Sequence, residues 1–580
     1  MSERRCIDPE LIIPISRLST EAFKTGTWGT RRPVHEEKAS PCRVACPAGN
    51  NIPMALAKAS LRDYDGALAA FLEESPLPGV CGRACYHLCE GECNRGQWDG
   101  AVHIQALERA ASELGTARPQ ALTDAGKDVP VAVVGSGPAG LSAAYHLARM
   151  GHPVTLVESE EALGGLLRWG IPQYRVPLGA LERDLARILS LDLRVQTGTR
   201  LDGALLEELR SSHKAVFLAL GAQRSLGVDI PGNTLPEVWL GVDFLKAVRQ
   251  EALGGIQGWV VVVGGGNVAI DAALTARKLG ARGVDLVCLE QREEMPAHER
   301  EISDALEEGL TFHNGWGPKG IRDKNGKVGG VECVRCLSVF DGEGKFNPSY
   351  DESSTLDLEA DHVILATGQA LDLSALGEGG PFGEELGSAL QVEERTLQTG
   401  ISGIYAGGDM VKAPGSVVEA IGAGKRAALA IHLATLGKSL KEAEGRVLMG
   451  EGATFSIHAL FHERSGWEPS KVVRFEELET LFLDDRPRRE LPRVRPELRT
   501  GFREINLSVK SDEAAELAGR CFFCGTCTGC DRCYLYCPEN SIVPPDAEKA
   551  KYEANDDYCK GCAACAAVCP RGVMSMGEGK

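Results

Sequence analysis

The 580-residue sequence has few aromatic residues, fewer basic than acidic side chains and no long apolar run. Aromatic residues make up 6% of the chain, and 63 Lys and Arg stand against 81 Asp and Glu, for a formal charge of -18. Proteins that bind nucleic acids concentrate basic side chains, so this balance argues against that class. No stretch reaches roughly 18 uninterrupted apolar residues, and the opening residues lack the apolar core of a secretion signal. We therefore expect a cytoplasmic protein without a membrane span.

Cysteine is scarce in the middle of the chain and abundant at both ends. Seven cysteines lie up to Cys93, three between Cys288 and Cys336, and ten from Cys521 onward. Disulfide scaffolds are short and secreted, whereas clustered thiols in a long cytoplasmic chain are typical of metal ligands. We interpret the two ends as metal modules attached to an enzyme.

A first glycine turn follows the apolar run VPVAVVG and precedes an Ala- and Leu-rich helical pattern. In a Gly-x-Gly-x-x-Gly turn the first glycine makes the bend, the second admits a pyrophosphate and the third lets the helix pack on the strand. An acidic residue at the end of the next strand accepts a ribose hydroxyl. The alternative is a glycine-rich turn without a ligand. The predicted cofactor-binding residues are Gly135, Gly137, Pro138, Ala139, Gly140 and Glu158.

A second turn follows WVVVVGG, with Ala at the third position of the motif. The strand after it ends at Glu290, where a carboxylate binds the ribose 2′-hydroxyl of NAD and repels the 2′-phosphate of NADP. This favours NAD(H), although Arg292 is close enough in sequence to offer a phosphate an alternative partner. A solvated acid without a ligand is the other interpretation. The predicted residues are Gly264, Gly266, Asn267, Ala269 and Glu290.

Two nucleotide turns in one chain indicate a flavin facing a nicotinamide. GIYAGGDM supplies Gly408 and Asp409 before a further helix that we expect to face FAD. The runs FLALGA (217–222) and ILATGQ (364–369) are expected to be strands of the flavin domain. The flavin carries the chemistry, so we predict no catalytic acid or base from the protein.

These blocks as a set resemble the small subunit of glutamate synthase. The resemblance covers roughly residues 40–435 and includes GGLLRWGIPQYRVP, where Gly165 and Arg168 are predicted cofactor contacts. It implies FAD at the first turn and at the Gly-Gly-Asp sequence. Many members carry paired arginines where this chain has Leu289 and Glu290, a difference that supports NAD.

The tail contains two Cys-x2-Cys-x2-Cys-x3-Cys-Pro runs. Such runs bind two 4Fe–4S clusters, and the fourth cysteine of each run ligates the other cluster. Zinc is the alternative, but zinc ribbons lack the third thiolate and the trailing Cys-Pro. One predicted ligand set is Cys527, Cys530, Cys533 and Cys569, and the other is Cys559, Cys562, Cys565 and Cys537. Cys521 and Cys524 are left without a ligand position, and we interpret them as spare thiols.

The front end contains PCRVAC and CGRACYHLCEGEC. The glutamate synthase resemblance implies one cluster nearest the flavin, held by Cys46, Cys85, Cys89 and Glu108. A second front cluster needs two further cysteines, which relatives carry upstream of the position of Cys42. Here that stretch is VHEEKAS, so Cys42 and Cys93 serve as ligands only if Cys81 or Cys6 substitutes.

The expected fold class is α/β, with two Rossmann-like domains of the glutathione-reductase type. An N-terminal α-helical iron–sulfur domain and a C-terminal ferredoxin-like α+β domain flank them. The expected boundaries are 1–125 for the helical domain, 126–235 with 362–435 for the FAD domain, 236–361 for the NAD domain, 436–510 for a connector and 511–580 for the ferredoxin domain.

These features predict an electron-transfer subunit that links iron–sulfur clusters to NAD(H) through FAD. The tail resembles the ferredoxin subunit of 2-oxoacid oxidoreductases, which implies catalytic partner subunits that oxidise a 2-oxoacid, of the phenylglyoxylate or pyruvate type, or an aldehyde. A hetero-oligomer is therefore expected, with such catalytic subunits or a ferredoxin-like carrier as the partner. The alternatives are the small subunit of a glutamate synthase and a non-catalytic electron wire or scaffold.

Overall fold

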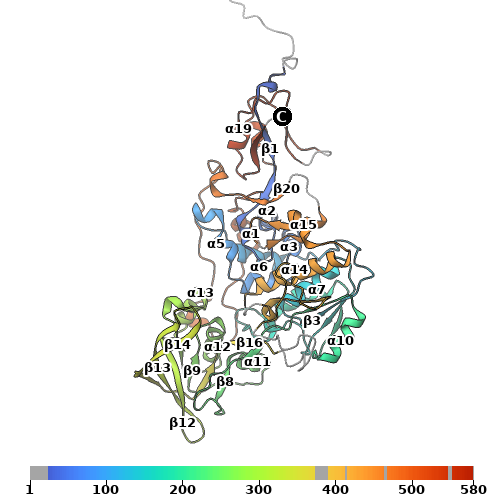
Figure 1. Cartoon of the computed structure of the whole chain (residues 1–580). Coiled ribbons are helices and arrows are strands. Elements are labelled where there is room, and N and C mark those ends of the chain that lie inside the picture. The colour runs from blue at the N-terminus through green and yellow to red at the C-terminus, as the bar shows by residue number, and fades with distance from the viewer. Residues whose placement is uncertain are drawn as a thin grey trace, which may run out of the picture.

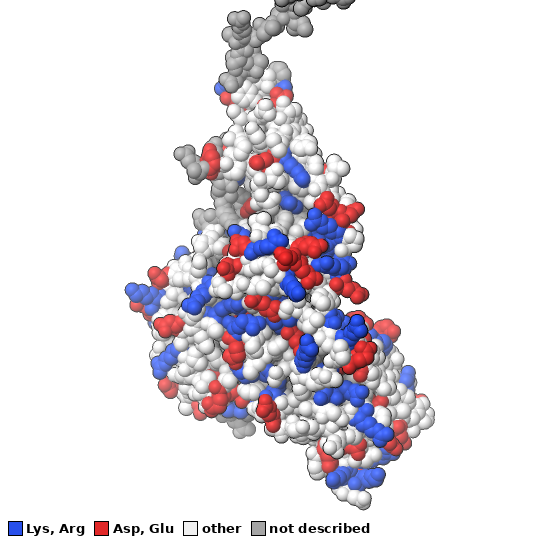
Figure 2. Space-filling view, turned by 180° about the vertical axis from the view of Figure 1, so that it is seen from behind, with Lys and Arg blue, Asp and Glu red and all other residues white. Residues whose placement is uncertain are grey.

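The protein is described by a computed structural model. It covers residues 24–372, 389–411, 415–452, 454–462, 467–546 and 551–578. Cys6 and the opening segment lie outside the described residues. Figure 1 shows the tail at one end of the molecule, a layer of helices in the middle and two nucleotide-binding units side by side at the other end. On the face shown in Figure 2, acidic and basic side chains are intermingled over most of the surface.

The first nucleotide unit is built on a five-stranded parallel sheet of order β17-β6-β3-β4-β5. Its central strands are fully buried runs such as VAVV, as expected of a parallel sheet covered on both faces. Helices α7 and α14 pack against each other beside the sheet. The strands are β3 (Val131–Val134), β4 (Val154–Val157), β5 (Arg194–Gln196), β6 (Ala215–Leu218) and β17 (Ile404–Ala406), and the helices are α7 (Pro138–Arg149), α8 (Leu166–Trp169), α9 (Leu178–Leu189), α10 (Gly203–Ser212) and α14 (Val417–Thr435).

The second nucleotide unit repeats this design with the parallel order β11-β10-β9-β15-β8. A three-stranded antiparallel sheet of order β12-β13-β14 is attached to it. Its elements are β8 (Val238–Leu240), α11 (Gly241–Arg249), β9 (Trp259–Val263), α12 (Asn267–Lys278), β10 (Gly283–Cys288), α13 (Glu299–Glu307), β11 (Thr311–Asn314), β12 (Trp316–Asp323), β13 (Val328–Phe340), β14 (Phe346–Leu358) and β15 (His362–Leu365).

The assignment of residues 364–369 to a strand of the flavin domain is wrong. Strand β15 pairs with β9 and β8 in the second sheet. The chain returns to the first unit only afterwards, through a short antiparallel pair of β16 (Gln369–Ala370) with β7 (Arg224–Ser225). Buried strands of both sheets are equally apolar, so the sequence pattern does not reveal which sheet a strand joins.

The N-terminal region is a layer of short helices, but it begins with two strands. Strand β1 (Arg31–His35) pairs with β23 (Met574–Glu578) at the C-terminal end of the chain, and β2 (Glu37–Ala39) pairs with β20 (Trp467–Val472). The expectation of an all-helical region is therefore wrong for residues 31–39. The helices are α1 (Pro41–Ala45), α2 (Ile52–Ser60), α3 (Tyr64–Leu72), α4 (Pro78–Ala84), α5 (Leu88–Gly91) and α6 (Ile104–Leu114).

The segment after the nucleotide units runs back along the N-terminal helices. Arg83 and Arg109 both bind Glu504, with the Nε atom of Arg83 2.8 Å from its carboxylate. Helix α17 (Ser511–Ala518) packs on α2 and α6 rather than on the tail clusters. The remaining elements are α15 (Leu440–Val447), β18 (Leu448–Met449), β19 (Thr454–Phe455), α16 (Ile457–Phe461), α18 (Arg532–Leu535), β21 (Ile542–Val543), β22 (Glu553–Ala554) and α19 (Ala564–Ala567).

In the described part of the chain, no helix combines the length and the apolar character needed to cross a membrane.

Candidate functional site

The first glycine turn connects β3 to α7 and has the geometry of a nucleotide site. Gly135 has a φ of 100°, and a Cβ atom there would lie 2.3 Å from the carbonyl oxygen of Ala219. A Cβ atom on Gly140 would lie 1.8 Å from the carbonyl oxygen of Gly135, so helix and strand approach too closely for a side chain. At Gly137 nothing lies within 4 Å of such an atom. The open space lies at the N-terminus of α7, where a pyrophosphate fits.

The second turn, between β9 and α12, repeats this arrangement. Gly264 has a φ of 139°, and a Cβ atom there would lie 2.3 Å from the carbonyl oxygen of Ala366. Gly266 faces open space, as Gly137 does, and Ala269 is buried against the turn. Both turns therefore combine close packing with an open helix N-terminus.

The two acidic residues that follow these turns differ in their partners. Glu158 is 4% exposed and accepts hydrogen bonds from the backbone and hydroxyl of Ser136 and from the backbone of Glu160. Glu290 lies beside the second turn, since a Cβ atom on Gly265 would be 2.7 Å from its Oε2 atom. Among the described residues, none donates a hydrogen bond to the Glu290 carboxylate, which leaves it available to a ribose.

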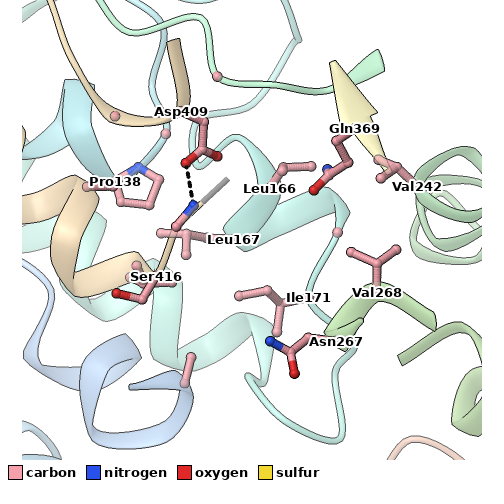
Figure 3. A pocket seen from close by; sticks show the side chains of 18 of the residues that line it. Pro138, Leu166, Leu167, Ile171, Val242, Asn267, Val268, Gln369, Asp409 and Ser416 are labelled. Atoms are coloured by element: carbon pink, nitrogen blue, oxygen red, sulfur yellow. Dashed lines mark hydrogen bonds between the residues drawn. The ribbon is translucent and has the colours of Figure 1, made fainter. Parts of the chain in front are cut away.

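A cavity of about 540 Å³ lies where the two turns and the Gly-Gly-Asp sequence meet. Pro138 and Asp409 lie at one side of it, Asn267 and Val268 at the other, with the apolar side chains of α8 between them (Figure 3). Ala420 on α14 also lines it. A mostly apolar cavity with a few polar groups suits the flat flavin and nicotinamide rings of two nucleotide cofactors that meet there.

The carboxyl of Asp409 is held at the edge of this cavity. Its Oδ1 atom accepts a hydrogen bond from the backbone of Gly415 at 3.1 Å (Figure 3). Burial raises its pKa. Helix α14 begins at Val417, with a capping box between Ser416 and Glu419, and its N-terminal residues also line the cavity.

Of the two cofactor contacts predicted from the block GGLLRWGIPQYRVP, Gly165 lies at the first turn and Arg168 lies away from the cavity. Gly165 has a φ of 51°, and a Cβ atom there would lie 2.9 Å from the Cα atom of Gly137, so it belongs to the first turn. Arg168 does not line the cavity. Its guanidinium donates to the carbonyl of Leu163 at 2.6 Å and to Glu182 at 2.5 Å. Arg168 therefore holds α8 in place instead of contacting a cofactor in the cavity. Its pairing with Glu182 could not be foreseen from the sequence.

The eight tail cysteines line two small cavities. One, of about 20 Å³, is lined by Cys527, Cys530, Cys533 and Cys569. The other, of about 10 Å³, is lined by Cys537, Cys559, Cys562 and Cys565. In each, three thiols come from one run and the fourth from the other run, the exchange typical of a two-cluster ferredoxin. No three His, Cys, Asp or Glu side chains of the described ranges are close enough to hold a single metal ion, as a zinc site requires.

The predicted ligands of the N-terminal cluster lie close enough to influence one another's protonation. Burial, followed by the Glu108 carboxylate, raises the pKa of Cys85 to about 12. Burial and the thiols of Cys46 and Cys85 raise the pKa of Cys89. Burial and Asp184 raise the pKa of Glu108 to about 8. Iron bound to these thiols would stabilise the thiolates that burial disfavours, so the residues fit a cluster.

Cys81 belongs to the same group, although the sequence offered it only as a substitute ligand for the second front cluster. It is buried on α4, and burial followed by Glu108 and Cys85 raises its pKa. Cys81 therefore lies beside the predicted ligands Cys46, Cys85 and Glu108. The Cys-x3-Cys spacing of Cys81 and Cys85 could have indicated this, because residues four apart share one helix face.

Tyr86 joins the N-terminal cluster region to the nucleotide cavity. It follows Cys85 directly and lines the 540 Å³ cavity together with Ala84. Its hydroxyl accepts a hydrogen bond from the side chain of Asn267 at 2.7 Å, and its ring stacks on His298 at 4.9 Å. The predicted cluster ligand Cys85 is thus one residue from a side chain in contact with the second nucleotide turn. No sequence motif marked this tyrosine.

Comparison with known families and proteins agrees with this geometry. Residues 129–424 match the pyridine nucleotide-disulphide oxidoreductase family, and residues 32–119 match the 4Fe–4S cluster domain II of dihydropyrimidine dehydrogenase. Residues 526–573 match the 4Fe–4S dicluster domain. The chain therefore has the domains for FAD and NAD(P) and carries 4Fe–4S domains at both ends.

Three curated proteins illustrate the range of relatives. The NADP(+)-dependent formate dehydrogenase subunit beta of Moorella thermoacetica is 34% identical over 68% of this chain and 59% of its own length. The NADPH-Fe(3+) oxidoreductase subunit beta of Geobacter sulfurreducens is 33% identical over 87% of this chain and 78% of its own length. The NAD-dependent dihydropyrimidine dehydrogenase subunit PreT of Escherichia coli is 32% identical over 68% and 90%.

Proposed function

Because the chain belongs to the pyridine nucleotide-disulphide oxidoreductase family, we propose that it exchanges electrons between NAD(H) and its iron–sulfur clusters through FAD. The cavity shared by both nucleotide turns and by Tyr86 carries this proposal. It brings the two nucleotide sites and the edge of the N-terminal cluster region to one place. A scaffold without turnover would not need both open helix N-termini at such a cavity.

The number of electrons that each cofactor exchanges requires FAD to lie between the nicotinamide and the iron–sulfur clusters. NAD⁺ takes up two electrons and one proton to become NADH, whereas a cluster transfers one electron at a time; the flavin, when bound, supplies both kinds of step. The protein's own part is to bind and align. Gly137 and Gly266 leave room for the two pyrophosphates, and Asp409 and Asn267 border the space between them.

Glu290 supports a preference for NAD over NADP. Its carboxylate lies at the second turn without a partner among the described residues and would repel a 2′-phosphate. Arg292, the nearby cation, binds Glu299 at 2.7 Å. The relatives are named for both nucleotides, so the proposal depends on this residue rather than on similarity.

Partner subunits would supply the substrate chemistry. Three relatives are named as subunits of a formate dehydrogenase, an iron(III) oxidoreductase and a dihydropyrimidine dehydrogenase. We infer a hetero-oligomer in which a partner oxidises a 2-oxoacid, of the phenylglyoxylate or pyruvate type, or an aldehyde and passes its two electrons to the tail.

The experiment is to purify the chain anaerobically and measure viologen reduction with NADH and with NADPH. We expect activity with a clear preference for NADH. Activity with neither nucleotide would overturn the electron-transfer proposal. A preference for NADPH would overturn only the role given to Glu290.

A further inference from the structure

A third small cavity of the described chain is lined by four cysteines. Its volume is about 20 Å³, and the thiols come from three segments far apart in the sequence. One lies on α1, one follows the residue that caps the end of α5, and two lie in the loop after α17. They are Cys42, Cys93, Cys521 and Cys524.

This cavity has the same construction as the two in the tail. Those are lined by four cysteines each and have volumes of about 10 and 20 Å³. In all three, a Cys-x2-Cys pair contributes to the set and at least one thiol comes from a distant segment. This site has the same number of thiols and a similar volume as the two predicted cluster sites of the tail. It therefore suits the same iron–sulfur cluster.

The loop that brings the last two thiols is firmly attached to the N-terminal helices. Arg520 donates hydrogen bonds to the carbonyl oxygens of Gly100 at 2.7 Å and Ala101 at 3.0 Å. Gly525, with a φ of 73°, passes so close to Lys38 that a Cβ atom would lie 2.2 Å from its carbonyl oxygen. The arrangement of the four thiols therefore follows from packing that the chain maintains itself.

Polar groups already point at the sulfur atoms of this site. The side-chain amide of Asn94 donates to the Sγ atom of Cys524 at 3.4 Å, and the backbone N–H of Phe523 donates to Cys521 at 3.3 Å. The hydroxyl of Ser40 lies 3.2 Å from the Sγ atom of Cys42. Hydrogen bonds to sulfur stabilise thiolates and tune the potentials of iron–sulfur clusters. Three such contacts at one group of thiols favour ligands over inert core residues.

We propose that Cys42, Cys93, Cys521 and Cys524 bind a further 4Fe–4S cluster, the second of the N-terminal region. The expectation that Cys81 substitutes as a ligand here is not supported, because Cys81 lies with Cys46, Cys85 and Glu108, and Cys6 lies outside the described residues. The matched cluster domains end at residue 119 and resume at 526, so neither contains the pair in the loop.

The position of this cluster connects the two ends of the molecule. Helix α1 carries Cys42, a ligand of the proposed cluster, and is followed directly by Cys46, a predicted ligand of the cluster nearest the flavin. One short helix therefore connects the two sites. On the other side, Arg571 follows the tail motif, and its guanidinium donates to the backbone oxygen of Phe522 between the two loop thiols. The cluster would accept one electron from the tail and pass one electron on, with no net change. It thus extends the proposed function, but its presence is measurable without it.

The test is the iron content of the full chain, purified anaerobically. Four clusters give about 16 iron and 16 sulfide per chain, whereas three give about 12 of each. The double variant C521S/C524S should lose about four iron atoms. The matched control C333S/C336S removes another buried Cys-x2-Cys pair, on β13, and should keep them all.

Combined variants separate loss of this site from general unfolding. C42S with C524S should lose no more iron than either variant alone, because both thiols serve one cluster. C42S with C46S should lose about eight iron atoms, because they serve two clusters. Wild-type protein with about 12 iron, a zinc ion or a disulfide at residues 521 and 524 would each overturn the proposal. Since iron content does not depend on NADH oxidation, failure here leaves the proposed function intact, and loss of NADH oxidation leaves this proposal intact.

Discussion

The two ends of the molecule bind clusters in opposite ways. In the tail, all eight thiols lie within residues 527–569, and two short runs exchange one ligand each. In the N-terminal region, the thiols extend from Cys42 to Cys524, and α17, which precedes the last two of them, packs on α2 and α6. The predicted ligands of the tail thus come from one continuous segment, whereas those of the N-terminal region come from segments far apart in the chain.

This difference has a consequence for assembly. A local run can bind iron as soon as its own loop is formed, whereas a site completed across the chain requires the N-terminal helices and the loop after α17 together. The pairing of β1 with β23 then attaches the tail to the same N-terminal segment.

The largest effect is expected from cutting the connection between the flavin cavity and the clusters. C85S removes a predicted cluster ligand next to Tyr86, so NADH-dependent viologen reduction should fall to background. Ferricyanide reduction, which reduced flavin supports directly, should persist. C336S, a buried thiol on β13, is the control and should change neither rate. Undiminished viologen reduction in C85S would show that electrons leave by another route.

The ligand exchange in the tail predicts which iron losses add. C569S and C527S alone should each lose about four iron atoms, and together no more than that, because both line one cavity. C569S with C559S should lose about eight, because they line different cavities. If the first pair adds and the second does not, each run holds its own cluster and the exchange is wrong.

Nucleotide choice should be independent of both ends. E290R replaces a repelling carboxylate with a cation that can bind a 2′-phosphate. A hydrogen bond to a charged group contributes about 1.5–3 kcal/mol, so kcat/KM should shift roughly 10- to 150-fold toward NADPH. E293R makes the same reversal of charge at an exposed neighbouring position and is the control. Iron content should not change in either variant. An unchanged nucleotide preference in E290R would refute the role of Glu290.

A smaller effect is expected where the two cluster regions meet. Arg571 is a half-buried cation near the loop thiols, and partial burial lowers its pKa while Cys521 and Cys530 raise it. Removing its charge in R571Q should lower the potentials of the adjacent clusters by about 50 mV, equivalent to roughly 1 kcal/mol for one electron. R571K retains the charge and should restore the potentials in an EPR-monitored redox titration. Equal shifts in both variants would indicate a packing effect instead.

Local patterns predicted much of this molecule. The glycine turns, the helices after them and the tail motifs each depend on residues within about 30 positions, so their chemistry could be predicted from spacing. The match of residues 129–424 to an FAD- and NAD(P)-binding family confirms the fold class.

Long-range pairing could not be predicted in this way. Nothing in RRPVH indicates that β1 joins the last strand of the chain, and VILA reads equally well as a strand of either sheet. The thiols of Cys521 and Cys524 extend the tail spacing in sequence but lie against the N-terminal helices in space. The packing of α17, rather than the cysteine pattern, determines which site they join.

The proposed function requires one electron path that runs from the nucleotide cavity to the tail. Holoprotein reduced with dithionite and freed of excess reductant should be mixed with NAD⁺ while the NADH formed is measured. Reduced flavin yields one NADH and four connected clusters yield two more, so we predict about three NADH per chain. A yield of about one NADH per chain would mean that only the flavin donates electrons to NAD⁺ and would refute a continuous path to the tail.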